Sequence, residues 1–233
     1  MSPQIPAMPP PPPVDAGQGP HGSQPWYSRG DDLAFLDTAV KMKIAAAAGG
    51  LPNASRHLSH YLSNTGEDLT LDPDEILGDE PGLKALVDRL VSDVVRRIAG
   101  GAASNGGYDA PIPFQSEWYG YTFANTDWFL AIGAVHASAT GVVTVHAPNP
   151  EGATPHITLD CRSHLFDRYN WDGDKKTTIA GMTFTDRELG GLHTAGLAKE
   201  FTMYGSSEVK HYQGVLPISA PLDLPTPPGR PGR

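Results

Sequence analysis

Apolar residues in the first half of the chain recur every three or four positions, which is the period of an α-helix with one buried face. The pattern predicts helices over 31–48, 53–63 and 82–98, and a shorter one after Asp72. Gly49-Gly50 ends the first run, and an acidic first turn follows the capping residue Asp72. Residues 31–104 are therefore expected to form a helical segment.

The period changes after the glycine-rich stretch 100–107, where apolar and polar residues begin to alternate as they do in half-buried strands. The alternation predicts strands over 119–124, 128–137, 141–146, 156–166, 201–204 and 208–212. Short turns between most of these runs indicate antiparallel neighbours. A short helix is expected over 185–195, because Thr185 can cap it and Glu188 occupies the capping-box position. The predicted fold class is α+β, with N-terminal helices followed by a curved antiparallel sheet over 105–216.

Proline marks both ends of the chain, with nine of the 23 prolines in residues 1–30 and six in residues 217–233. The unbroken run 9–13 favours a solvated polyproline II conformation, so both ends are expected to be disordered tails. The alternative is recognition, because the spacing of Pro6, Pro9 and Pro12 suits an aromatic groove.

Charge and composition exclude several classes of protein. The chain has 17 basic and 26 acidic residues, a net charge of −9, and no basic stripe, which argues against a nucleic-acid-binding protein. The chain contains no run of 18 apolar residues, so no transmembrane helix is predicted. The amino end lacks the basic and apolar regions of an ordinary signal peptide. The single cysteine, Cys161, excludes an internal disulfide and a cysteine-rich zinc site.

Candidate chemistry is concentrated in residues 167–176. The segment reads Asp167-Arg168-Tyr169-Asn170-Trp171-Asp172-Gly173-Asp174-Lys175-Lys176. Carboxylate oxygens are ligands for Mg²⁺, and lysine ammonium groups can neutralise a phosphate. The alternative is a hairpin tip whose charges are simply solvated. Other chemistries lack their motifs, since the chain has no Gly-x-Ser-x-Gly elbow and no phosphate-binding glycine loop.

The order of several segments resembles the colicin M family, bacteriocins that cleave the lipid-linked peptidoglycan precursor. The resembling stretches are His60-Tyr61-Leu62-Ser63-Asn64-Thr65-Gly66, the runs 128–133 and 141–145, Asp167-Arg168-Tyr169-Asn170-Trp171-Asp172, and Glu200-Phe201-Thr202-Met203-Tyr204-Gly205. They occur in the family's order across about residues 57–213.

This resemblance implies an α+β toxin with a half-barrel-like sheet. It implies a Mg²⁺-dependent phosphodiesterase that acts on the undecaprenyl-pyrophosphate-linked precursor, lipid II, outside the cytoplasmic membrane and so inhibits cell-wall synthesis. It also implies an immunity protein as partner, and delivery to the target cell envelope or secretion without a recognisable signal peptide. Asp167 is similar to the family's essential carboxylate and Tyr169 to its motif neighbour, with Asp172 or Asp174 as a further metal ligand.

The segment departs from the family pattern at two places. Asn170 stands where the family has a second aspartate, and Lys175 and Lys176 stand where it has a His-Arg pair. The lysines would hold the diphosphate electrostatically. His164 and His193 are then the candidates for a general base near Asp167.

Two further hypotheses remain open at this point. A relative with the same fold and no hydrolytic activity would bind a phosphorylated lipid or a protein partner through the same groove. A structural or accessory module of a secreted assembly would use its proline-rich tails to connect to larger partners.

Overall fold

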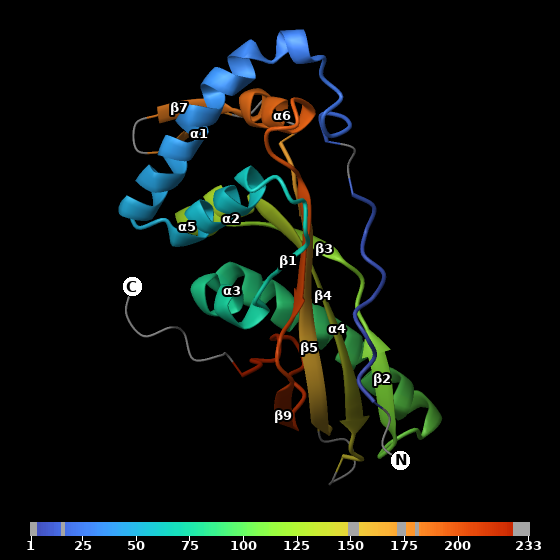
Figure 1. Cartoon of the computed structure of the whole chain (residues 1–233). Coiled ribbons are helices and arrows are strands. Elements are labelled where there is room, and N and C mark those ends of the chain that lie inside the picture. The colour runs from blue at the N-terminus through green and yellow to red at the C-terminus, as the bar shows by residue number, and fades with distance from the viewer. Residues whose placement is uncertain (1–3, 15–16, 149–153, 172–175, 180–181, 226–233) are drawn as a thin grey trace.

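The molecule combines six α-helices with a seven-stranded mixed sheet in the part of the chain that the structure describes (Figure 1). The computed structural model describes residues 4–14, 17–148, 154–171, 176–179 and 182–225. The α+β class expected from the sequence is confirmed. No helix among these residues is long and apolar enough to cross a membrane.

Four helices come first, as the apolar period predicts. They are α1 (Gly30–Ala48), α2 (Pro52–Leu62), α3 (Pro73–Asp79) and α4 (Pro81–Asn105). Proline opens α2, α3 and α4, where its missing N–H has no partner to lose. The Asp72 carboxylate accepts hydrogen bonds from the backbone N–H groups of Asp74 and Glu75, which confirms the predicted cap.

The predicted end of α4 is wrong. The helix continues through the glycine-rich stretch to Asn105 and ends at Gly106, whose φ of 67° is left-handed. Ala99 and Ala102 are buried on the same face as the preceding valines, and this packing outweighs the low helix propensity of Gly100 and Gly101.

The strand expected over 128–137 is also partly wrong. Its first half is a helix, α5 (Thr126–Ala131), because the Asn125 side chain caps the backbone N–H groups of Asp127 and Trp128. Gly133, with a φ of 81°, then turns the chain into β4 (Ala134–Val145). The second half of the expected strand and the separate strand at 141–146 are one continuous strand.

The sheet is built on two long central strands. Its members are β1 (Leu69–Thr70), β2 (Pro111–Gln115), β3 (Tyr119–Thr122), β4, β5 (His156–Tyr169), β8 (Phe201–Ser206) and β9 (Lys210–Val215). The order is β1-β8-β5-β4-β2, with β3 also pairing β4 and β9 also pairing β5, and the sheet is not closed. All pairs are antiparallel except β1 with β8, which is parallel. The expectation of a purely antiparallel sheet is therefore wrong, because the chain between α2 and α3 adds a short strand along β8.

A separate two-stranded sheet lies near α1 and carries the end of the candidate segment. It consists of β6 (Lys176–Ile179) and β7 (Met182–Thr185), and α6 (Asp186–Thr194) follows directly. The predicted capping box is confirmed, since the Thr185 hydroxyl and the Glu188 carboxylate each accept the other residue's backbone N–H.

Two apolar cores hold the elements together. One lies between the helices α1, α2 and α6 and the strands β4, β5 and β8, around Trp128, Leu165 and Met203. The other lies where α4 packs along β4 and β5, through Val95 and Leu159. Each core draws residues from both the helical segment 31–104 and the sheet segment 105–216, so the two segments share their interior.

The described parts of both proline-rich ends contact the helices and the sheet, whereas their composition predicts disordered tails. Residues 4–14 run along the sheet (Figure 1), and the Trp118 indole N–H donates to the carbonyl of Pro10 at 2.8 Å. At the other end, Leu222 and Leu224 are buried in the core beneath α4. Aromatic and leucine side chains thus give these ends contacts that proline content alone does not indicate.

Candidate functional site

The candidate segment lies at the carboxyl end of β5. Asp167 and Tyr169 occupy the same face of that strand, opposite Met203 and Phe201 of β8. Asp167 is half-buried, and Asn170, just beyond the strand, is half-buried as well.

The remaining residues of the segment are only partly covered. Lys176 is exposed and begins β6, paired with Thr185. Asp172 and Lys175, which the sequence assigned to metal and diphosphate binding, lie outside the described residues. The structure therefore places Asp167, Tyr169 and Asn170 at the carboxyl end of β5, and Lys176 at the start of β6.

Tyr169 is the centre of an aromatic cluster. Its ring stacks on Phe201, with centroids 4.8 Å apart and planes within 11°. His57 stacks on Tyr169 at 6.3 Å, Tyr61 is tilted against it at 5.6 Å, and Trp171 meets it edge-on at 5.4 Å. Burial raises the pKa of Tyr169 well above its usual value of 10. Its hydroxyl therefore stays protonated near neutral pH and can donate a hydrogen bond.

The two histidines of α2 pack against this cluster. His57 is fully buried and its Nδ1 donates to the carbonyl of Asn53 at 2.8 Å. Burial lowers the pKa of His57 to about 4, so the ring is neutral. His60 packs edge-on against Phe201 at 4.4 Å, and its Nε2 donates to the carbonyl of Glu67 at 2.7 Å.

An apolar pocket of about 70 Å³ opens beside the same cluster. It is lined by Met42, Ala46, Ala54, Leu58, Phe129, Leu130, Tyr169, Trp171, Phe184 and Leu189. The indole N–H of Trp171 is buried and has no hydrogen-bond partner among the described residues. The lining of the pocket is therefore mostly apolar, and it includes Tyr169 at the carboxyl end of β5.

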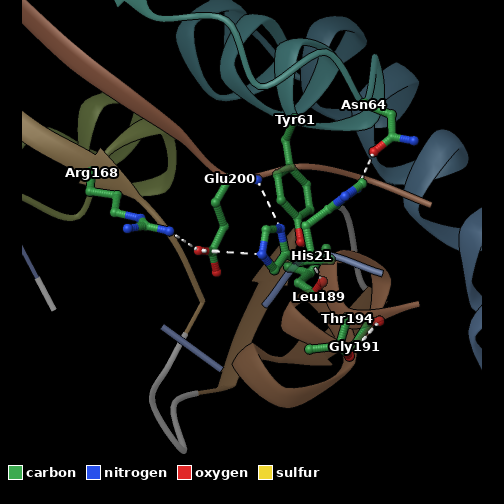
Figure 2. Close-up of polar contacts among 9 residues, drawn as sticks. His21, Tyr61, Asn64, Arg168, Leu189, Gly191, Thr194 and Glu200 are labelled. Atoms are coloured by element: carbon green, nitrogen blue, oxygen red, sulfur yellow. Dashed lines mark hydrogen bonds and ion pairs between the residues drawn. The ribbon is translucent and has the colours of Figure 1, made fainter. Parts of the chain in front are cut away.

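A second cluster, of charged residues, includes Arg168. Because side chains alternate along a strand, Arg168 lies on the face of β5 opposite to Asp167 and Tyr169. The guanidinium of Arg168 lies 2.8 Å from Oε2 of Glu200, whose side chain is completely buried (Figure 2). Both residues lie in stretches that resemble the family, but the resemblance assigns neither of them a role. The sequence signal was limited to a single glutamate next to the apolar start of a strand, and only the fold reveals its partner.

His193 completes the charged cluster. Its Nδ1 accepts the backbone N–H of Glu200 at 3.1 Å, while its Nε2 faces the Glu200 carboxylate at 3.9 Å. Burial, followed by the charges of His21 and Arg168, lowers the pKa of His193 to about 4. This histidine is held by Glu200, so the structure does not place it as a base beside Asp167.

Residues 17–24 cover the charged cluster and tie the amino end to α6. The backbone N–H groups of Gly22 and Gln24 donate to the carbonyls of His193 and Thr194 at 3.0 and 2.9 Å. The ring of His21 lies 5.2 Å from that of His193. Its Nε2 is 2.8 Å from Oδ1 of Asn64, a contact drawn in Figure 2.

His164, the other candidate base, is fixed elsewhere. Its Nε2 is 2.8 Å from the Thr140 hydroxyl and its Nδ1 is 2.7 Å from the Ser206 hydroxyl. Burial lowers the pKa of His164 to about 4. Because His164 and Asp167 are three positions apart along β5, the two side chains leave opposite faces of the sheet. The expectation that His164 would approach Asp167 is not met.

No three His, Cys, Asp or Glu side chains come together in a metal-binding arrangement within the described ranges. Asp167 is the one described residue of the two metal ligands expected from the sequence. No family model, no curated protein and no solved structure matches the chain.

Proposed function

We propose that the chain is an antibacterial, colicin M-like protein that acts on lipid II as a Mg²⁺-dependent phosphodiesterase and so inhibits cell-wall synthesis. The proposal includes a sheet curved as a half-barrel, action at the cell envelope and an immunity protein as partner. One observation carries it. The separate stretches that resemble the family contact one another, since Tyr61 of α2, Tyr169 of β5 and Phe201 of β8 form one aromatic cluster.

The surroundings of this cluster suit an amphiphilic substrate. The apolar pocket can take a segment of the isoprenoid chain, because its lining is almost entirely hydrocarbon and aromatic. The diphosphate would be held by Asp167 near the carboxyl end of β5 and by Lys176 at the start of β6. In this arrangement Lys176 neutralises phosphoryl charge and the protonated Tyr169 hydroxyl is a hydrogen-bond donor.

Mg²⁺ is the cofactor that the resemblance implies, with Asp167 and Asp172 as ligands. The half-buried Asp167 carboxylate at the end of β5 fits the role of one hard oxygen ligand. When bound, the ion would polarise a phosphoryl oxygen and offset the negative charge of the diphosphate.

A second candidate is a relative that binds the lipid diphosphate without hydrolysing it. Two observations favour it. Asn170 replaces a carboxylate of the family motif and cannot accept a proton, and both candidate histidine bases are engaged elsewhere, His193 with Glu200 and His164 with Thr140 and Ser206.

Purified lipid II distinguishes these functions when cleavage and binding are measured on the same sample. The phosphodiesterase predicts release of the pyrophosphorylated head group with Mg²⁺ and none with a chelator. The binding protein predicts saturable association in both conditions with no product. Absence of both association and product would contradict the two candidates together.

A further inference from the structure

The amino-terminal segment meets the sheet with a period of three residues. Pro9 is buried and Pro6 and Pro12 are half-buried, as are Ile5 and Met8 before the proline run, whereas Pro10, Pro11 and Pro13 are exposed. A polyproline II helix has three residues per turn, so a single edge of it would contain positions 6, 9 and 12. The burial of the prolines is that expected of a proline helix lying with one edge on the sheet, and Ile5 and Met8 add contacts at its amino end.

The indole N–H of Trp118 donates a hydrogen bond to the backbone of this segment. Trp118 Nε1 donates to the carbonyl of Pro10 at 2.8 Å, and its ring contacts Phe166 of β5 at 6.2 Å. Proline lacks an N–H, so its carbonyl is the polar group that a binding surface can recognise. An aromatic surface with an indole donor is the chemistry by which proteins bind proline-rich segments.

The segment is held loosely in comparison with the residues that follow it. Within the described ranges, residues 4–14 make no backbone hydrogen bond to the sheet, while Gly22 and Gln24 bond to the backbone of α6. A cavity of about 350 Å³ remains between residues 4–8 and Arg162, His164 and Ser206. The amino end can therefore leave the sheet while residues 17–24 stay fastened.

We infer that Trp118 and Phe166 form a polyproline-binding groove whose resident ligand is residues 4–13 of the same chain. When residues 4–13 leave the groove, an uncharged proline-rich segment of another protein, with prolines three residues apart, binds in their place. The resident segment itself, Gln4-Ile5-Pro6-Ala7-Met8 followed by five prolines, has no charged side chain and defines this ligand class. The inference is independent of the function proposed for the β5 end.

A full-length variant in which residues 4–13 are replaced by a glycine-serine stretch of equal length tests the groove. Neither core contains a residue from this segment, so the fold should be retained. The probe is a fluorescent peptide with the sequence of residues 1–14, added in trans and followed by anisotropy. We expect saturable binding to the replaced variant and at least tenfold weaker binding to the natural chain, whose groove is occupied. Equal binding to both proteins, or no saturable binding to the variant, would overturn the inference.

Two matched controls separate recognition from adhesion. Trp118→Phe in the replaced variant keeps an aromatic ring and removes the donor, and we expect at least tenfold weaker binding. A peptide with alanine at positions 6, 9 and 12 should lose binding, whereas one with alanine at 11 and 13 should retain most of it. Unchanged binding by Trp118→Phe, or equal losses by the two peptides, would contradict a groove that reads one edge of a proline helix.

Discussion

The guanidinium of Arg168 lies 2.8 Å from a Glu200 carboxylate that is completely buried. The pair joins the end of β5 to the residue that precedes β8, directly behind the strand face that carries Asp167 and Tyr169. A buried carboxylate without its partner is strongly unfavourable, so this contact fixes how the two strands meet beneath the candidate site.

Replacing Arg168 by methionine should destabilise the protein by about 3 kcal/mol, because it removes the guanidinium that pairs with the buried Glu200 carboxylate. Urea unfolding followed by circular dichroism measures this loss. Adding Glu200→Gln to the same protein should recover part of the stability, since the uncompensated charge disappears. A loss of under about 1 kcal/mol for Arg168→Met would mean that the ion pair does not stabilise the junction.

Gly17 allows the amino end to pass over Glu200. It has a φ of 60°, and a Cβ added there would lie 2.8 Å from Oε2 of Glu200. Gly17→Ala should therefore loosen residues 17–24 and increase their cleavage by a protease. Gly22→Ala is the matched control, because Gly22 also has a positive φ, 70°, but no atom within 4 Å of an added Cβ. Equal increases in cleavage for the two substitutions would mean that steric contact with Glu200 does not add to the backbone strain.

Three buried histidines predict how stability depends on pH. The pKa values of His57, His164 and His193 are lowered from 6.5 to about 4 by burial. Between pH 6.5 and 4 the unfolded chain therefore binds protons that the folded protein does not. The free energy of unfolding should fall as the pH is lowered through this window, and the contribution of these groups should level off below it.

His164→Gln tests this origin, because glutamine can still bond to Thr140 and Ser206 but does not titrate. Urea unfolding at pH 7.5, 6.5 and 5.5 measures how the free energy of unfolding changes with pH. This change should be about one third smaller in the variant than in the natural protein, since one of the three histidines is gone. An unchanged slope would assign the acid sensitivity to other residues.

Filling the apolar pocket should weaken lipid binding if the isoprenoid chain enters it. Ala46 is buried in the pocket lining, and Ala46→Met would occupy the space that the lipid needs. We expect about tenfold weaker binding of lipid II, equivalent to about 1.4 kcal/mol. Ala47→Met, on the exposed side of the same helix, is the control and should bind normally. Equal affinities for the two variants would place the lipid elsewhere.

Local sequence rules predicted those parts of the fold that depend on neighbouring residues. The caps at Asp72 and Thr185 are where side-chain chemistry placed them. Burial decided the parts that were missed. α4 extends through its glycines because Ala99 and Ala102 are buried, and α5 replaces a strand because Asn125 caps it and Trp128 fills the core.

The candidate site was predictable only in part for the same reason. Alternation along β5 places Asp167 and Tyr169 on one face and Arg168 on the other, which a strand prediction already contains. The sequence did not indicate that Glu200 would meet Arg168, or that His193 would be held by Glu200 rather than by Asp167. Those partners are brought together by pairing between β5 and β8, which lie more than thirty residues apart.

The most direct test of the proposed function compares Asp167→Asn with Asp160→Asn in cleavage of purified lipid II in the presence of Mg²⁺. Both residues lie on β5, but the Asp160 carboxylate accepts from His211 on the other face of the sheet, away from the candidate site. We expect the natural protein and Asp160→Asn to release the pyrophosphorylated head group, and Asp167→Asn, still folded, to release none. Cleavage by Asp167→Asn at the natural rate would contradict the central role of Asp167.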